Sequence, residues 1–116
     1  MLFLCYPKCS TCRAAKTWLE SRGIAVEMRD IKEERPSAEE LRGWWKKSGL
    51  PLKRFFNTSG IQYRALNLSE RLPSMTEEEQ LELLATDGML VKRPILVDGD
   101  VVLTGFWETE WDMQLP

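Results

Sequence analysis

The sequence predicts an α/β fold built on a mixed β-sheet, with a group of helices inserted between its two halves. Three patterns support this: strand, helix and strand periodicities within the first thirty residues, a helical middle third, and two short apolar runs flanking a tight turn near the end. At 116 residues and 43% hydrophobic, the chain has the size and composition of one globular domain.

Residues 2–6 form a continuous apolar run closed by Pro7, which is typical of a central strand buried on both faces. Apolar residues then recur at helical spacing, with Ser10 as the candidate N-cap and Gly23 just past the last turn. Residues 24–28 alternate between apolar and polar side chains, as a strand does. This order predicts a right-handed βαβ unit with two parallel strands.

The middle of the chain is predicted to be helical. Two helices each begin at a capping box, in which a Ser or Thr and a Glu three residues later satisfy free backbone amides. These boxes are Ser37 with Glu40 and Thr76 with Glu79. The first helix ends at Gly49 and the second at residues 87–88. Between them, Pro51 is expected to open a short turn, and residues 57–60 a loop.

The last part of the chain predicts an antiparallel strand pair and a helix. Pro94 precedes an apolar run at 95–97, Asp-Gly at 98–99 supplies the turn, and a second run follows at 101–103. Residues 107–113 are amphipathic and predict a short final helix.

This order of elements, β-α-β, helices, then β-β-α, matches a thioredoxin-like, glutaredoxin-type sheet with a helical insertion. We expect about residues 1–33 and 89–116 to form the core of the single domain. About residues 34–88 would form the insertion.

Composition excludes several classes of function. Sixteen Lys and Arg against eighteen Asp and Glu give a net charge of −2, so we expect no direct nucleic-acid ligand. The apolar run at 1–6 is too short for a signal-peptide core, and no stretch approaches a membrane span, so we expect a cytoplasmic, thiol-reducing location and no membrane partner. Because histidine is absent, Cys-His and Ser-His nucleophile pairs and most catalytic zinc sites are excluded. We expect neither a metal nor a bound organic cofactor.

The sequence Cys9-Ser10-Thr11-Cys12 lies between the first strand and the first helix, where free backbone amides and the helix dipole favour an anion. A cysteine in such a motif can have its pKa lowered from about 8.5 to about 7. We expect Cys9 to attack and Cys12, one turn further, to resolve the mixed disulfide. Ser10, Thr11 and the positive charge of Lys8 would stabilise the thiolate. The part of the domain predicted as its core, about residues 1–33 and 89–116, is therefore also expected to carry the redox chemistry.

Other interpretations of these residues remain. The cysteine pair could be half of a zinc site completed by carboxylates or a second chain, or a chance pair of structural cysteines. Cys5 is most simply a small core hydrophobe. A cis bond before Pro94 would press the backbone of Arg93 and Pro94 towards a neighbouring site, whereas the alternative is an edge-strand proline beside two solvated cations.

Four motifs together are specific to a known family. They are residues 6–16 (YPKCSTCRAAK), residues 56–60 (FNTSG) with Tyr63, residues 87–95 (DGMLVKRPI), and Gly105-Phe106 before Trp111. The chain resembles the arsenate reductase-like (ArsC/Spx) family of the thioredoxin superfamily, in its C-x-x-C subgroup, over essentially its whole length. The resemblance implies a thioredoxin-like fold with a helical insertion, a cis bond before Pro94, Cys9 as the reactive cysteine, and Arg93 beside its thiolate.

The resemblance leaves the activity open. In the family's arsenate reductases, three arginines around one cysteine bind the oxyanion. Here Arg93 matches one of them, the second falls near Asn57, and residues 105–107 offer no arginine for the third, although Arg54 or Arg64 could substitute from shifted positions. Each missing arginine removes charge-assisted hydrogen bonds of about 1.5 to 3 kcal/mol. Arsenate reduction is therefore the weaker alternative.

In the Spx-type regulators, the dithiol is a redox switch and the insertion contacts the C-terminal domain of the RNA polymerase α subunit. Gly49 matches a glycine of that contact region, while residues 50–56 depart from the regulators. We therefore expect a thiol–disulfide oxidoreductase that uses Cys9, Cys12 and Arg93. Its partner would be a small thiol or a redox protein, with electrons from reduced glutathione, a glutaredoxin or a thioredoxin. The alternative is an Spx-like regulator of RNA polymerase.

Overall fold

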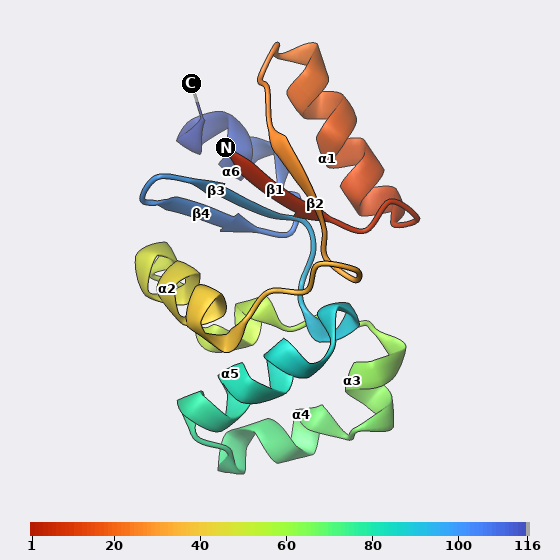
Figure 1. The fold of residues 1–116 in the computed structure, drawn as a ribbon, viewed down its shortest axis with the longest axis vertical. Coiled ribbons are helices and arrows are strands. Elements are labelled where there is room, and N and C mark those ends of the chain that lie inside the picture. The colour runs from red at the N-terminus through yellow and green to blue at the C-terminus, as the bar shows by residue number, and fades with distance from the viewer. Residues whose placement is uncertain (116) are drawn as a thin grey trace.

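Within residues 1–115, which the computed structural model describes, four short strands form one mixed sheet in the order β2-β1-β3-β4 (Figure 1). β1 pairs in parallel with β2, and β3 pairs antiparallel with both β1 and β4. The predicted fold class is confirmed. The strands are β1 (Leu2–Cys5), β2 (Glu27–Asp30), β3 (Ile95–Asp98) and β4 (Val101–Thr104).

Helices cover both faces of the sheet. α1 and α6 pack against one face, and α2 packs against the other, beyond which the short helices of the middle segment continue away from the sheet (Figure 1). The helices are α1 (Ser10–Ser21), α2 (Ala38–Ser48), α3 (Ile61–Ala65), α4 (Leu68–Arg71), α5 (Glu77–Thr86) and α6 (Glu108–Gln114). Three short 3-10 segments are η1 (Leu52–Phe55), η2 (Leu72–Ser74) and η3 (Gly88–Leu90). Within residues 1–115, no helix is long and apolar enough to cross a membrane.

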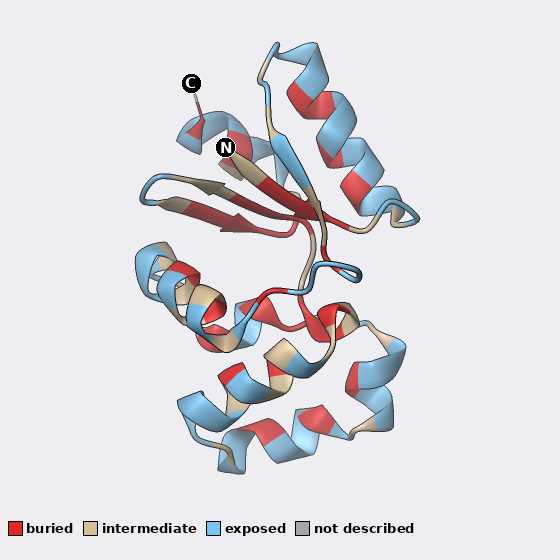
Figure 2. Ribbon diagram, in the orientation of Figure 1, coloured by how far each residue is buried: buried red, intermediate tan, exposed pale blue. Residues whose placement is uncertain are grey.

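β1 is buried on both faces, as predicted, because its side chains alternate between two hydrophobic layers. Phe3 and Cys5 pack with α1 and α6, in the layer that also holds Trp18 and Trp111. Leu4 points into the opposite layer, which extends through α2 and α5. Figure 2 shows buried residues along β1, β3 and β4, whereas β2 is exposed or intermediate. β2 is therefore the exposed edge on the parallel side.

The predicted boundaries of the second strand are wrong, because the strand begins and ends two to three residues later in the chain. The apolar alternation at 24–28 predicts the strand there, but pairing with β1 begins at Glu27 and ends at Asp30. Ile24 and Val26 instead pack against the α1 layer before the strand starts. Pairing with β1, and not the apolar alternation, therefore sets the limits of this strand. Met28, the last residue of the alternation, is 44% exposed.

Both predicted capping boxes are present. In α2, Ser37 Oγ accepts a hydrogen bond from the Glu40 amide at 3.1 Å, and Glu40 Oε1 accepts one from the Ser37 amide at 3.0 Å. Thr76 and Glu79 make the same exchange at the start of α5, at 3.1 and 2.9 Å. Gly49 ends α2 with φ of 68°, a left-handed conformation that favours glycine. The predicted insertion helices α2 and α5 thus begin where the sequence places them.

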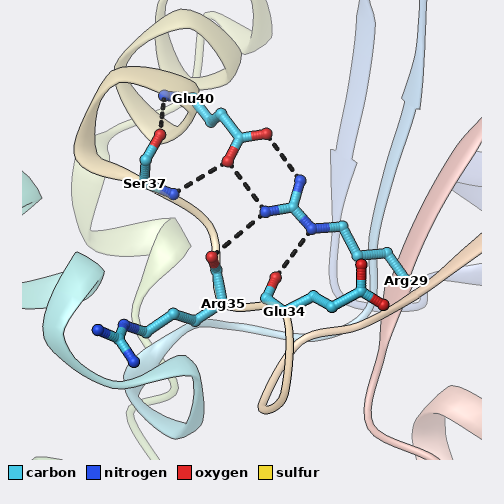
Figure 3. Close-up of polar contacts among 5 residues, drawn as sticks. All are labelled: Arg29, Glu34, Arg35, Ser37 and Glu40. Carbon is cyan, nitrogen blue, oxygen red and sulfur yellow. Dashed lines mark hydrogen bonds and ion pairs between the residues drawn. The ribbon is translucent and has the colours of Figure 1, made fainter.

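An ion pair ties the edge strand to the first insertion helix (Figure 3). The Arg29 guanidinium in β2 donates to both carboxylate oxygens of Glu40, at 2.7 and 2.9 Å. It also donates to the carbonyl oxygens of Glu34 and Arg35, at 2.8 and 3.3 Å. The hydrogen bond from Arg29, together with the Ser37 amide, lowers the pKa of Glu40 to about 2. The Arg29 side chain therefore links β2 to a side chain of α2 and to the backbone of the segment between them.

Glu40→Gln should destabilise the protein by about 1 to 2 kcal/mol at neutral pH, because the amide can keep the capping box but loses the charged pair. The loss should shrink as pH falls from about 5 towards 2, because the lowered pKa of Glu40 places its stabilising contribution above that range. Urea denaturation across this pH range measures the difference.

Glu78→Gln is the matched control, because it breaks a similar two-pronged pair with Arg42 in which the Glu78 side chain is 63% exposed. We expect it to cost less than Glu40→Gln, because solvent screens this exposed pair. Equal losses in the two variants would contradict the special role of the Arg29–Glu40 pair.

Candidate active site

Cys9 occupies the N-cap position of α1. Its backbone is extended, with φ of −86° and ψ of 125°, and its carbonyl oxygen already accepts the first intrahelical bond, from the Arg13 amide at 3.0 Å. The prediction of Ser10 as N-cap is thus wrong by one residue. This shift places a sulfur where helices ordinarily carry an oxygen that faces free backbone amides.

The surroundings of the Cys9 sulfur lower the pKa of its thiol below the ordinary value. Burial raises the pKa, but the neighbouring Cys12 and Thr11 amides, the Arg93 side chain and the Cys12 thiol, which all favour the charged form, outweigh it. Cys9 makes no short N-cap hydrogen bond of the kind that oxygen makes. The free amides favour the thiolate because their N–H dipoles attract a negatively charged sulfur more strongly than a neutral thiol.

Cys12 has the opposite environment. Its side chain is 2% exposed, in the layer between α1 and the sheet. Burial raises the pKa of Cys12 to about 12, although its sulfur accepts a hydrogen bond from the Tyr6 amide at 3.3 Å. The negative charge of Cys9 raises it further. Of the two, Cys9 therefore ionises first, and Cys12 remains a thiol at neutral pH.

Arg93 brings a positive charge from the other side of the site. Its guanidinium carbon lies 5.4 Å from the centroid of the Tyr6 ring. Within residues 1–115, its buried Nε and Nη1 atoms have no hydrogen-bond acceptor. Such unpaired buried donors are costly unless an anion accepts from them. The guanidinium is therefore positioned for the Cys9 thiolate and for an anionic group beside it.

The backbone around Pro94 fixes this arginine. The Arg93–Pro94 peptide bond is cis, as the family resemblance implies, and Pro94 is buried. The carbonyl oxygen of Pro94 accepts a hydrogen bond from the Gly105 amide at 2.8 Å. The carbonyl oxygen of Gly105 in turn accepts one from the Trp111 indole at 3.0 Å. Arg93 and the residues after β4 are thus held to one another.

A cavity of about 300 Å³ opens in front of the Cys9 sulfur. It is lined by Cys9, Thr11, Asn57, Ser59, Lys92, Arg93, Gly105, Phe106 and Trp107. None of these residues is acidic, and two are cationic. The cavity therefore suits a small group with negative charge or hydrogen-bond acceptors.

The insertion reaches this cavity through a short backbone ladder. Phe56 and Val91 form an isolated antiparallel bridge. The Lys92 amide donates to the Phe55 carbonyl oxygen at 2.8 Å, and the Asn57 amide donates to Leu90 at 2.8 Å. Asn57 and Arg93 therefore line the same cavity, although they are far apart in sequence.

The structure separates the predicted site residues into two groups. Cys9, Thr11 and Arg93 line the cavity, with Cys12 buried behind and Pro94 holding the arginine. Lys8 and Ser10 are exposed and do not line it.

Cys5 is buried in the same layer as Cys12, and burial followed by the charge of Asp30 raises its pKa. In the described part of the chain, no three His, Cys, Asp or Glu side chains come together as metal ligands.

Several lining residues were not singled out as site residues by the motif analysis. Ser59 lies in the predicted loop at 57–60. Lys92 is one of the two cations for which a solvated position is the alternative interpretation, and Trp107 opens the predicted final helix. Ser59 and Lys92 lie within the family motifs at 56–60 and 87–95, whereas Trp107 lies outside the motifs, directly after Gly105-Phe106. Only the fold shows that these segments meet at Cys9.

Comparisons with known proteins place this site in a family context. The model of the ArsC family matches residues 4–113. The uncharacterized protein YusI of Bacillus subtilis is 55% identical over 112 residues, which cover 97% of this chain and 95% of YusI. The regulatory protein MgsR of Bacillus subtilis is 33% identical, over 91% of this chain and 82% of MgsR. The global transcriptional regulator Spx of Listeria innocua is 28% identical, over 95% and 82%.

Solved structures are also similar to this chain in fold and sequence. The crystal structure of an ArsC family related protein from Bacteroides fragilis has a TM-score of 0.94 and 54% identity, covering 97% of this chain and 94% of that one. The crystal structure of a "possible arsenate reductase" from Streptococcus mutans has a TM-score of 0.89 and 44% identity, covering 98% and 97%. The relatives thus include both a regulator group and an arsenate reductase-like group.

Arg93→Gln should raise the pKa of Cys9 and slow its alkylation at neutral pH by up to about tenfold, because it removes a cation that favours the thiolate. Iodoacetamide alkylation followed by peptide mass mapping measures the rate at each cysteine. Cys12 should remain unmodified until Cys9 has reacted, because its pKa is about 12.

Lys8→Gln is the control, because Lys8 is the exposed cation nearest in sequence to Cys9. We expect it to change the alkylation rate much less than Arg93→Gln. Equal effects of the two variants, or faster alkylation of Cys12 than of Cys9, would contradict the assignment of the site.

Proposed function

This chain belongs to the ArsC family, and we propose that it is a thiol–disulfide oxidoreductase in which Cys9 attacks and Cys12 resolves. The observation that carries the proposal is the placement of the two thiols: Cys9 lies at the N-cap of α1 in a cavity shared with Arg93, and Cys12 is buried one turn further along. This placement lowers the pKa of Cys9 and raises that of Cys12. A lowered pKa favours the attacking thiolate, and a raised pKa keeps the resolving thiol from competing.

The reaction proceeds in two exchanges. The Cys9 thiolate attacks a substrate disulfide, so that a bond from Cys9 to one substrate sulfur forms and the other sulfur leaves as a thiolate. Cys12 then loses its proton to solvent and attacks Cys9, which closes the Cys9–Cys12 disulfide and releases the second thiolate. The substrate gains two electrons and the protein loses two.

The first exchange also activates Cys12. Burial raises the pKa of Cys12 most, and the negative charge of Cys9 and its side-chain interaction with Cys12 raise it further in the free dithiol. Once Cys9 is bound in a mixed disulfide, that charge is gone, so the pKa of Cys12 falls. Cys12 is therefore a better nucleophile after Cys9 has captured a substrate than before.

Electrons return from a thiol donor. Two molecules of reduced glutathione, or one dithiol of a glutaredoxin or thioredoxin, would reduce the Cys9–Cys12 disulfide and be oxidised in turn. Neither route needs a metal or a bound organic cofactor.

A second candidate function is that of a redox-sensing regulator, which the similarity to MgsR and Spx favours. The same dithiol would then act as a switch on the binding of the insertion to the RNA polymerase α subunit. Gly49 alone adds little to this candidate, because its φ of 68° accounts for a glycine at the end of α2.

Arsenate reduction is supported less well. Arg93 lines the cavity, but Asn57 and the Gly105-Phe106-Trp107 segment stand where further arginines would be expected. Arg54 lines a neighbouring cavity instead, and Arg64 lies on α3 and lines neither. With one arginine, the site lacks the charge-assisted hydrogen bonds that hold a doubly charged oxyanion.

Cys12→Ser should accumulate a mixed disulfide on Cys9 when mixed with oxidised glutathione, because the resolving thiol is missing, whereas Cys9→Ser should accumulate none. Intact-protein mass spectrometry detects the adduct. A coupled assay with reduced glutathione as donor and bis(2-hydroxyethyl) disulfide as acceptor measures turnover by the unmodified chain. Cys5→Ala is the matched control and should keep turnover.

Turnover that survives in Cys9→Ser would contradict the oxidoreductase assignment. An adduct without turnover, together with redox-dependent binding of the RNA polymerase α subunit, would favour the regulator instead. Arsenate reduction that is lost in Arg93→Gln would favour the third function.

A further inference from the structure

A cavity of about 280 Å³ lies within the insertion, apart from the cavity in front of Cys9. Its lining residues come from η1, α3, α4, η2 and α5, which extend away from the sheet (Figure 1). The insertion cavity and the Cys9 cavity share no lining residue. The proposed redox chemistry therefore gives the insertion cavity no role.

The wall of the insertion cavity is mainly apolar. Leu52, Tyr63 and Leu72 line it, and each of these residues is at most 7% exposed. Pro73 adds a further apolar surface. An apolar wall with a few polar groups is typical of a small-molecule site, in which burial of apolar surface supplies most of the affinity.

The hydroxyl group of Tyr63 has no hydrogen-bond partner among residues 1–115, although the side chain is only 5% exposed. A buried tyrosine hydroxyl ordinarily finds a partner. In the same part of the chain, the unpaired side-chain atoms that are fully enclosed belong to Trp18, Arg93 and Thr104. The Tyr63 hydroxyl is not one of them, so an occupant of the insertion cavity can reach it.

Gln80 brings a second polar group to the insertion cavity. Its amide nitrogen donates to the carbonyl oxygens of Leu72 and Met75, at 3.4 and 3.3 Å. These bonds fix the amide, and its oxygen accepts no hydrogen bond from residues 1–115. A hydroxyl oxygen and an amide oxygen are both acceptors. Together, Tyr63 and Gln80 therefore suit a ligand that donates hydrogen bonds.

The charges that line the insertion cavity balance each other. Lys53 and Glu77 are the two charged residues of its lining, and both are exposed. An anionic ligand would be repelled by Glu77, and a cationic ligand would be repelled by Lys53. The lining therefore favours a neutral ligand.

We propose that the insertion cavity binds a small neutral molecule with an apolar body and a hydrogen-bond donor. Its apolar body packs against Leu52 and Leu72, and its donor binds the Tyr63 hydroxyl and the Gln80 amide oxygen. A cavity of about 280 Å³ has room for a bicyclic aromatic ring. This binding site goes beyond the proposed function, because it needs neither Cys9 nor Cys12.

Indole and benzofuran test the proposal, because the two molecules have nearly the same shape and only indole carries an N–H donor. Each is titrated into the reduced, nitrogen-15-labelled full chain, and the backbone amide chemical shifts are followed by NMR. We expect saturable shifts at the residues that line the insertion cavity. The Kd of indole should be roughly three- to tenfold lower than that of benzofuran, because indole adds a hydrogen bond.

Tyr63→Phe should weaken indole binding by roughly three- to tenfold and benzofuran binding much less. The variant should fold, because the hydroxyl that it removes has no partner within residues 1–115 and the ring keeps its edge contact with Phe56. Tyr6→Phe is the matched control, because Tyr6 is the other tyrosine of the chain and lines neither cavity. Ser69→Phe, at an exposed position of α4, should fill the insertion cavity and abolish binding of both probes.

Each other outcome overturns part or all of the proposal. If indole causes no saturable shifts below its solubility limit, or if the shifts centre on the Cys9 cavity, the binding site is wrong. If indole and benzofuran bind equally, or if Tyr63→Phe binds indole as the unmodified chain does, the assigned hydrogen bonds and the ligand class are wrong. The oxidoreductase assignment stands in every case, because the titration does not use turnover at Cys9.

Discussion

The candidate site depends on the placement of one sulfur at the N-cap of α1. There the Thr11 and Cys12 amides have no intrahelical acceptor, and they lower the pKa of Cys9 against the effect of its partial burial. The same geometry places Cys12 one turn further along, in the dry layer under the helix, where burial raises its pKa. A single helix start thus produces two thiols of opposite character.

The remaining elements bring charge and shape to that sulfur. β3 lies beside β1 in the sheet, so the segment that precedes it carries Arg93 and Pro94 to the start of α1. The Phe56–Val91 bridge adds the insertion, and the segment after β4 adds Gly105 and the exposed Trp107. The insertion is therefore part of the site and also, through Arg29 and Glu40, a firmly attached part of the fold.

Sequence reasoning predicted the fold class, the βαβ unit, both capping boxes and the strand pair, because each depends on local periodicity or on turn chemistry. It misplaced β2, because pairing with β1 overrides the apolar alternation before it. It did not distinguish α3 and α4, which are short and lack capping boxes. Cys9, Thr11 and Arg93 were predicted and line one cavity, but Lys92, Ser59 and Trp107 become site residues only through tertiary contacts. Lys8 was expected near the thiolate from its position in sequence, yet its side chain lies outside the cavity.

The most direct measurement of the central claim is a pH titration of the thiolate ultraviolet absorbance in the reduced protein, with the Cys9→Ser titration subtracted. The account predicts one thiolate whose midpoint lies below about 8.5, the value of a free cysteine, and no contribution from Cys12 across the neutral range. A Cys9 midpoint at or above that of a free cysteine would contradict it, because the helix start would then supply no activated sulfur.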